Sequence, residues 1–144
     1  MTFYPEFLKK DFFIAESLKV LDAGFGSFHT LVLCYDAASG RNRVFGCGKS
    51  KFGQLAIIEK KVVHDFVELQ TPEEIVQISV GSLHSLFLGR SGRLYGCGSN
   101  QEGQLGQCEA KKTYGEITSI PIPEGVKVHS VVSGSLNAMV LATQ

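Results

Sequence analysis

A block of eight residues occurs three times in this 144-residue chain, and this repetition constrains the fold more than any other feature. The copies read GSFHTLVL from Gly26, GSLHSLFL from Gly81 and GSLNAMVL from Gly134, so their first residues are 55 and 53 positions apart. A second block reads RVFGCGKSKFGQL from Arg43 and RLYGCGSNQEGQL from Arg93, 50 positions later. Self-similarity at a period of about 50 residues predicts a repeat architecture.

Each repeat is predicted to contain four short antiparallel strands. In the second repeat, alternation of apolar residues and turn signals predict strands at Val76–Val80, His84–Leu88, Arg93–Cys97 and Tyr114–Ile120. Four strands in about 50 residues are typical of a β-propeller blade, whereas helical repeats would show an apolar stripe of period 3.6. The chain has no Gly-Gly pair and no tryptophan, which disfavours kelch and tryptophan-aspartate propellers.

We therefore expect an all-β fold, a partial β-propeller with four-stranded antiparallel blades. The predicted division is a trailing strand of a preceding blade at 1–17, repeat 1 at 18–70, repeat 2 at 71–122 and the first half of repeat 3 at 123–144. Such an open arc leaves strand edges unpaired on both sides. The missing blades are expected from another chain, from self-association or from further sequence.

The motifs resemble those of the regulator-of-chromosome-condensation repeat family. Its blades typically read Gly-x-x-His-Ser/Thr, then Gly-x-Val/Leu-Tyr/Phe-x-x-Gly, then Gly-Gln-Leu-Gly, and the best match here spans Ile75 to Gly106. The resemblance implies that the open arc belongs to a propeller of seven blades. Four positions depart from the pattern, because Ala56 replaces the last glycine, Asn137 replaces the motif histidine, and Cys47 and Cys97 stand where an aromatic residue is frequent.

The motif residues are interpreted as structural. Equivalent positions in successive blades lie on different spokes, so one histidine per blade favours a hydrogen-bonding role over catalysis. The Gly-Gln-Leu segment is expected to form a turn in which the amide satisfies loop backbone and the leucine anchors the loop. The structural set comprises Gly26, His29, Gly53, Gln54, Leu55, Gly81, His84, Gly103, Gln104, Leu105 and Gly134.

No catalytic residue, cofactor or metal site is predicted. The sequence has no P-loop, HExxH or GxSxG motif, and its acidic residues suggest no acid–base pair. The four cysteines, Cys34, Cys47, Cys97 and Cys108, are widely spaced, and the matching Cys47 and Cys97 belong to separate blades, which disfavours zinc and a dense disulfide framework.

Three lysine pairs are the candidate partner-binding residues. The chain has 14 Lys+Arg against 14 Asp+Glu, but Lys9-Lys10, Lys60-Lys61 and Lys111-Lys112 recur every 51 residues, each before a β-rich stretch. They should therefore share one rim, where they could bind an acidic protein surface or phosphates. The alternative, which we favour, is solvated lysines that protect strand ends, partly neutralised by neighbouring glutamates.

The leading functional hypothesis is a non-enzymatic protein-interaction or scaffold module in a larger assembly. Its expected partners are other protein chains, first of all one that completes the propeller. The resemblance implies a second, guanine-nucleotide exchange on a small GTPase. The segment Tyr35–Arg43, five residues longer than its counterpart, is then the candidate wedge, with Arg41 and Arg43 as its test residues. Chromatin binding through the lysine rim is a third hypothesis and is not favoured.

The expected setting is intracellular. No apolar run approaches the roughly 18–20 residues of a membrane span, and the N-terminus lacks the basic and hydrophobic regions of a signal peptide. No membrane partner is therefore expected. Cytoplasmic, cytoskeletal and nuclear locations remain open.

Overall fold

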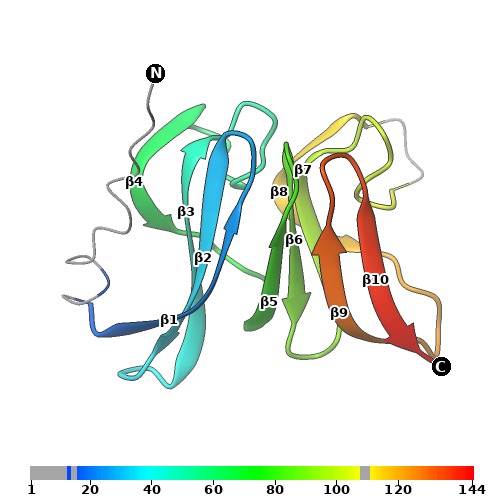
Figure 1. Ribbon diagram of the computed structural model, residues 1–144, viewed down its shortest axis with the longest axis horizontal. Helices are drawn as coiled ribbons and strands as arrows, with labels where there is room; N and C mark the ends of the chain where they lie inside the picture. Colours follow the sequence, from blue (N-terminus) through cyan, green and yellow to red (C-terminus); the bar gives the residue numbers. More distant parts are fainter. Residues whose placement is uncertain (1–12, 14–15, 108–110) are drawn as a thin grey trace.

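The structure is a computed structural model, and it describes residue 13, residues 16–107 and residues 111–144. The described residues form ten strands in three antiparallel sheets, which follow one another across Figure 1. The first sheet contains β1 (Leu18–Phe25), β2 (His29–Asp36), β3 (Arg41–Lys49) and β4 (Val62–Glu68) in that order. The second contains β5 (Ile75–Val80), β6 (His84–Gly89), β7 (Leu94–Ser99) and β8 (Thr113–Ile120). The third pairs β9 (Lys127–Ser133) with β10 (Ala138–Thr143).

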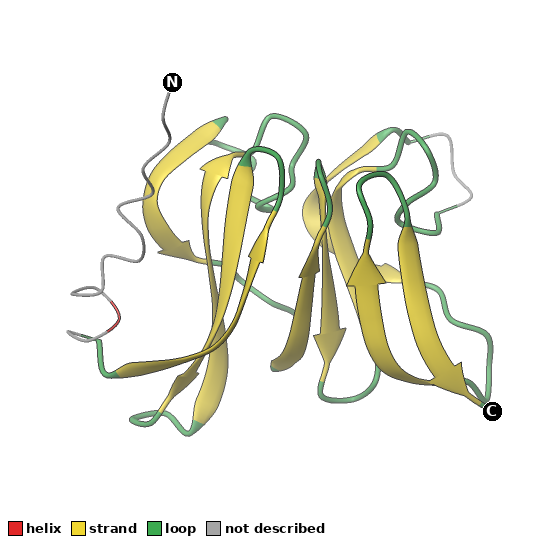
Figure 2. Cartoon of the chain, in the orientation of Figure 1, coloured by secondary structure: helices red, strands yellow, loops and turns green. Residues whose placement is uncertain are grey.

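This architecture confirms the predicted fold class. All four strands expected in the second repeat are present, with bounds that differ from prediction by a few residues at most. The sheets are almost pure strand and loop (Figure 2), and each four-stranded sheet is a simple meander in chain order. The expected trailing strand at 1–17 lies largely outside the described residues, and the repeat boundaries remain predictions.

The core lies between the sheets, because each central strand buries side chains on both faces. Leu31 and Leu33 of β2 pack between the first and second sheets, where they meet Phe87 of β6 from the other side. Leu86 and Leu88 of β6 point the opposite way, into the core between the second and third sheets. This period-two alternation makes the second sheet a layer between the first and the third, as the blade-on-blade packing of a propeller requires.

The innermost strands bring the three sheets together. β5 lies against β1, β2 and β3 of the first sheet, and β9 lies against β5 and β6. The ends of β1, β5 and β9 and the turns that follow them line an open groove of about 350 Å³. β4 and β8 are the fourth strands of their sheets, at the opposite edge from this groove.

Candidate interaction surfaces

The motif histidine of the first sheet binds the second sheet. His29 Nε2 lies 2.9 Å from Ser85 Oγ, and the Ser85 hydroxyl donates to the carbonyl of Gln54 over 2.7 Å. Since the single hydroxyl proton goes to that carbonyl, Ser85 Oγ accepts from His29 Nε2–H, which assigns the Nε2-protonated neutral tautomer. A histidine, a serine and the Gly-Gln-Leu turn thus form one buried relay across the first junction.

The second junction lacks this relay. His84 occupies the position of His29, but Ala138 stands where Ser85 stands in the first junction. His84 is fully buried, and within the described part of the chain neither ring nitrogen makes a hydrogen bond of good geometry. The two junctions therefore share a backbone arrangement and differ in polar pairing.

Both histidines are held neutral near pH 7. Burial lowers the pKa of His29 to about 4, with the charge of His84 as a second cause and a backbone group of His84 as a partial offset. Burial also lowers the pKa of His84, against a weaker opposing effect of the Asn137 backbone. Burial thus keeps both imidazoles neutral, and of the two, within the described residues, His29 alone makes a side-chain hydrogen bond to the neighbouring sheet.

The three leading glycines leave room for these side chains. A Cβ on Gly81 would lie 2.6 Å from His84 Nε2, and one on Gly26 would lie 2.5 Å from His29 Cε1. In the third sheet the space at Gly134 is taken by the amide of Asn137. The motif thus needs glycine because the residue three positions later folds back over it, in addition to the tight turn that joins the strands.

The Gly-Gln-Leu turns have the same geometry in both repeats. Gln54 Oε1 accepts from the amide of Phe52 over 3.0 Å, and Gln104 Oε1 accepts from the amide of Glu102 over 2.9 Å. The leucines that follow are buried. Gly53 and Gly103 have φ of 81° and 74°, in the left-handed region that favours glycine.

Both described lysine pairs lie on one rim. Lys60-Lys61 immediately precede β4 and Lys111-Lys112 immediately precede β8, at the upper edge of Figure 1, and all four residues are exposed. The carbonyl of Lys61 accepts from Ser50 over 2.7 Å, and that of Lys112 accepts from Asn100 over 2.8 Å. Lys111 Nζ also lies 4.8 Å from the centre of the Tyr114 ring. Lys9 and Lys10 lie outside the described residues.

The candidate wedge segment Tyr35–Arg43 lies in an extended hairpin. Strands β2 and β3 stay paired up to Asp36 and Arg41, and the turn between them closes with Gly40 at φ 67°. The five additional residues therefore lengthen two paired strands, where they gain ladder hydrogen bonds.

The two arginines of this hairpin lie near acidic side chains of the first two sheets. Arg43 binds Glu68 with Nη2 2.7 Å from Oε2, and its Nη1 lies 3.4 Å from Asp36 Oδ2. Arg41 is exposed at the start of β3. The bond from Arg90 is the main cause that lowers the pKa of Glu74 to about 2, and the charge of Arg41 adds to it.

The outward face of the third sheet is an apolar surface that sequence reasoning did not identify. Met139 and Leu141 occupy the positions of Leu86 and Leu88, but they are 74% and 65% exposed, against 0% and 4% for their counterparts in β6. The motif alone would have located them, because the same pattern had already placed buried leucines in two copies. β10 also has an unpaired edge among the described strands.

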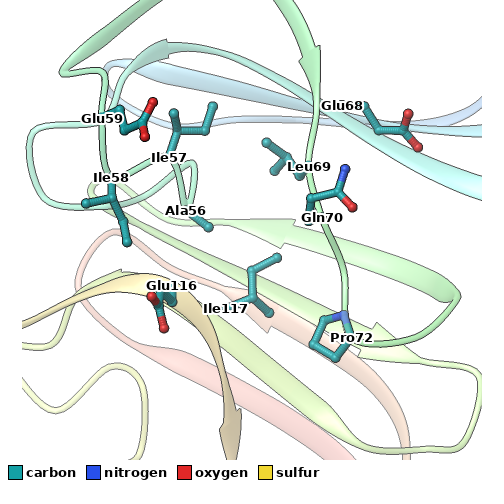
Figure 3. A pocket seen from close by; sticks show the side chains of 10 residues that line it. All are labelled: Ala56, Ile57, Ile58, Glu59, Glu68, Leu69, Gln70, Pro72, Glu116 and Ile117. Atoms are coloured by element: carbon teal, nitrogen blue, oxygen red, sulfur yellow. The ribbon is translucent and has the colours of Figure 1, made fainter.

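A second surface that the sequence did not predict is a groove of about 460 Å³ between the first two sheets (Figure 3). Its lining comes from three separate segments, the loop after the first Gly-Gln-Leu turn, the β4–β5 connection and β8. These are residues 56–59, residues 68–70 with Pro72, and residues 116–117. No sequence pattern links them, since they meet only through the packing of two sheets.

Two searches of the described residues gave negative findings. Within residues 13, 16–107 and 111–144, no three His, Cys, Asp or Glu side chains gather so that they could hold a metal ion. Over those same ranges, no helix is long and apolar enough to cross a membrane.

Successive four-stranded sheets with the same motifs at their junctions define this chain as an arc of a repeat-built β-propeller. Two family models described as "Regulator of chromosome condensation (RCC1) repeat" match it, over residues 75–104 and 91–141. The chain belongs to the RCC1-like repeat family. A search of curated proteins gave no match.

Solved propellers have the same fold. Human WBSCR16 is 29% identical with a TM-score of 0.67, and the match covers 81% of this chain and 30% of that one. Prp20p from Saccharomyces cerevisiae is 16% identical with a TM-score of 0.75, covering 88% and 31%. Yeast RCC1 (Prp20) in complex with Kap60 is 21% identical with a TM-score of 0.64, covering 85% and 30%. This chain therefore spans less than a third of the length of these structures.

Proposed function

We propose that this chain is a non-enzymatic protein-interaction module whose arc is continued, on the β10 side, by a further blade. That blade comes from another protein chain or from sequence outside these 144 residues. The proposal rests on one observation, the exposure of Met139 and Leu141 on a face that the preceding sheet uses for packing.

The repeat itself indicates what should cover this face. The equivalent leucines Leu86 and Leu88 pack against Val128 and Val131 of β9, the first strand of the next sheet. Apolar side-chain area in contact with water costs about 25 cal/mol per Å², so the exposure of Met139 and Leu141 is unfavourable. A strand resembling β5 or β9, with β-branched residues facing Met139 and Leu141, would bury it.

Backbone hydrogen bonds between the turns that follow β1, β5 and β9 support continuation in the same direction. The amide of Ser27 donates to the carbonyl of Ser82 over 3.2 Å, and the amide of Ser82 donates to the carbonyl of Ser135 over 3.1 Å. Each sheet thus donates to the next one along the chain. A blade added after β10 would therefore present a carbonyl to the amide of Ser135.

Light scattering after size exclusion tests the proposal on the full chain. We expect self-association or capture of a repeat-containing protein, and we expect Met139→Lys with Leu141→Lys to abolish it. Val62→Lys, at an exposed valine of β4, is the matched control and should change nothing. A folded, monodisperse 15.6 kDa monomer that captures no repeat-containing protein would contradict the supply of this blade by another chain and leave sequence outside these residues as its source.

The lysine rim is a second part of the proposed interaction surface. Its support is the equivalent placement of Lys60-Lys61 and Lys111-Lys112 before corresponding strands. Replacing these four lysines by glutamate should weaken capture of an acidic partner, and the effect should grow at low salt. Unchanged capture by a normally folded variant would leave the lysines as solvated strand-end residues.

Guanine-nucleotide exchange is the alternative function. Its support is likeness of fold to Prp20p, whose reported binding properties concern Gsp1p and histones. The ion pairs of Arg43 with Glu68 and Asp36 weigh against a wedge in the hairpin. Acceleration of fluorescent-nucleotide release across a panel of GTPases would favour exchange, and histone capture would favour chromatin binding.

An intracellular setting is part of the proposed function. It agrees with the free thiols of Cys34, Cys47 and Cys97.

A further inference from the structure

The groove between the first two sheets has fixed walls. The Gly-Gln-Leu turn of the first sheet lies close to β8, where a Cβ built on Gly53 would lie 2.6 Å from the Cα of Gly115. Ile57 and Ile117 in its lining pack against the core between these sheets. Because both walls are anchored to the same core, the groove is formed before any ligand binds, which reduces the ordering cost of binding.

The floor of the groove is apolar and its margin is acidic. Figure 3 shows Ala56, Ile57, Leu69 and Ile117 between the carboxylates of three glutamates. Ile58 stands beside them and is 70% exposed, although it is a large aliphatic residue. An occupant of this groove therefore gains most if it carries an aliphatic side chain.

The three carboxylates differ in their pairing. Glu68 is bound by Arg43, with Nε to Oε1 at 3.0 Å and Nη2 to Oε2 at 2.7 Å. Glu59 and Glu116 are exposed, and neither has an ion pair with another described residue. Two carboxylates without a counter-ion, on opposite sides of an apolar floor, favour a ligand that brings its own positive charge.

We propose that this groove binds a short segment of a partner protein in which Lys or Arg residues flank an aliphatic one. This inference rests on the proposed interaction function and adds a partner class to it. The aliphatic side chain packs on Ile57, Ile58 and Ile117, and the flanking cations pair with Glu59 and Glu116. A volume of about 460 Å³ lies within the roughly 300–1,000 Å³ of ordinary ligand sites, and it accommodates a few side chains.

Nearby basic residues limit where this segment can run. Lys60 and Lys61 directly follow Glu59 and lead to the rim, so a cationic segment that continued past Glu59 would meet like charge. The segment is therefore expected to run from Glu59 toward Glu116 and Pro72, away from the lysine rim. The two surfaces select partners of opposite charge and can be tested separately.

Fluorescence anisotropy with labelled peptides tests the inference on the full chain. The probe is the hexapeptide Leu-Arg-Leu-Lys-Leu-Arg, and its acidic counterpart is Leu-Glu-Leu-Asp-Leu-Glu. We expect the basic peptide to bind in the groove and the acidic peptide not to bind there. The affinity of the basic peptide should fall as the salt concentration rises. Glu59→Gln with Glu116→Gln should weaken basic-peptide binding about fivefold to tenfold, as two partly exposed ion pairs allow.

The matched control replaces two exposed glutamates outside the groove, Glu102→Gln with Glu124→Gln, and should change affinity by less than about twofold. Ile58→Ser should also weaken binding, since the floor contributes apolar contact. Equal losses in the groove and control variants would show unspecific charge attraction and overturn the inference, as would no loss in the groove variant. The Met139→Lys, Leu141→Lys protein should keep full peptide affinity, so failure here is distinct from failure of the proposed assembly.

Discussion

His29 Nε2 and Ser85 Oγ lie 2.9 Å apart, and this contact joins the motif histidine of one sheet to the motif serine of the next. In the sequence these two residue types are neighbours, since His84 directly precedes Ser85. In the fold the histidine of each repeat turns toward the following repeat. At the first junction the histidine of one sheet therefore donates to the serine of the next, whereas at the second junction Ala138 replaces the serine and His84 makes no such bond.

The first prediction concerns this contact. Ser85→Ala should lower the free energy of unfolding by about 1–3 kcal/mol, because it leaves His29 Nε2 buried without its partner and the Gln54 carbonyl with only the weaker donor Cys97 Sγ, 3.4 Å away. The reverse change at the second junction, Ala138→Ser, should raise it by about 0.5–1 kcal/mol by offering a hydroxyl to His84. Urea unfolding measures both changes.

Ala142→Ser, at another exposed position of β10, is the control for Ala138→Ser and should have no effect. If Ala138→Ser and Ala142→Ser behave alike, the serine position does not form the relay at the second junction. If Ser85→Ala is neutral, the relay makes no net contribution at the first.

The second prediction concerns acid stability. His29 has a pKa of about 4 in the folded protein, against 6.5 for the free side chain, so the unfolded chain takes up this proton first as the pH falls. The contribution of His29 is therefore fully present above about pH 6.5 and is lost progressively down to about pH 4, by about 3 kcal/mol in total. The lowered pKa of His84 acts in the same direction.

Urea unfolding between pH 6.5 and 5 measures this loss before most carboxylates titrate. His29→Asn, which introduces the residue type that the third repeat has at position 137, should be less stable at pH 7 but should show a shallower slope with pH. Parallel slopes for the two proteins would mean that His29 is protonated in the folded state.

The sequence predicted the parts of this structure that depend on local pattern. Strands such as Thr113–Ile120 follow from alternation and turn chemistry within a few residues. The five additional residues of Tyr35–Arg43 could be counted from the sequence, but their arrangement could not be predicted, because an insertion in a hairpin can either bulge or extend the ladder, and the pairing energy decides. Loop length alone does not distinguish these outcomes.

The interaction surfaces depend on how sheets pack, so the sequence predicted them least. Glu59, Glu68 and Glu116 lie on one groove because two sheets meet there, and no spacing rule connects them. The His29 to Ser85 contact was equally hidden, although a buried hydrogen-bonding role was expected for the histidine. The regular interval of the lysine pairs agrees with the placement of the two described pairs before β4 and β8, whereas their role in binding stays a prediction.

The third prediction tests why the leading glycine is required. Gly81→Ala would place a Cβ 2.6 Å from His84 Nε2, so we expect a loss of about 1–3 kcal/mol of stability from overpacking. His84→Ala alone should cost stability by opening a cavity. The double variant should be more stable than the sum of the two losses, because the alanine at 81 then fills space that the imidazole has left. Additive losses in thermal unfolding would mean that the glycine serves only the backbone turn.

The last prediction compares the two copies of one turn. Ala56 has φ 52° and Gly106, its counterpart, has φ 61°, so both occupy the left-handed region that favours glycine. Ala56→Gly should therefore stabilise the protein by up to about 1 kcal/mol through relief of strain, less the greater freedom that glycine gives the unfolded chain. Gly106→Ala should destabilise it by about 1 kcal/mol, since a Cβ there meets only Ile120 Cγ2 at 3.4 Å and the cost lies in the backbone. Changes of opposite sign in the free energy of unfolding, measured by urea titration of the two variants, would support this prediction. A loss of stability in Ala56→Gly would contradict it. It would show that packing of the Ala56 methyl group against the core between the sheets contributes more than the backbone strain costs.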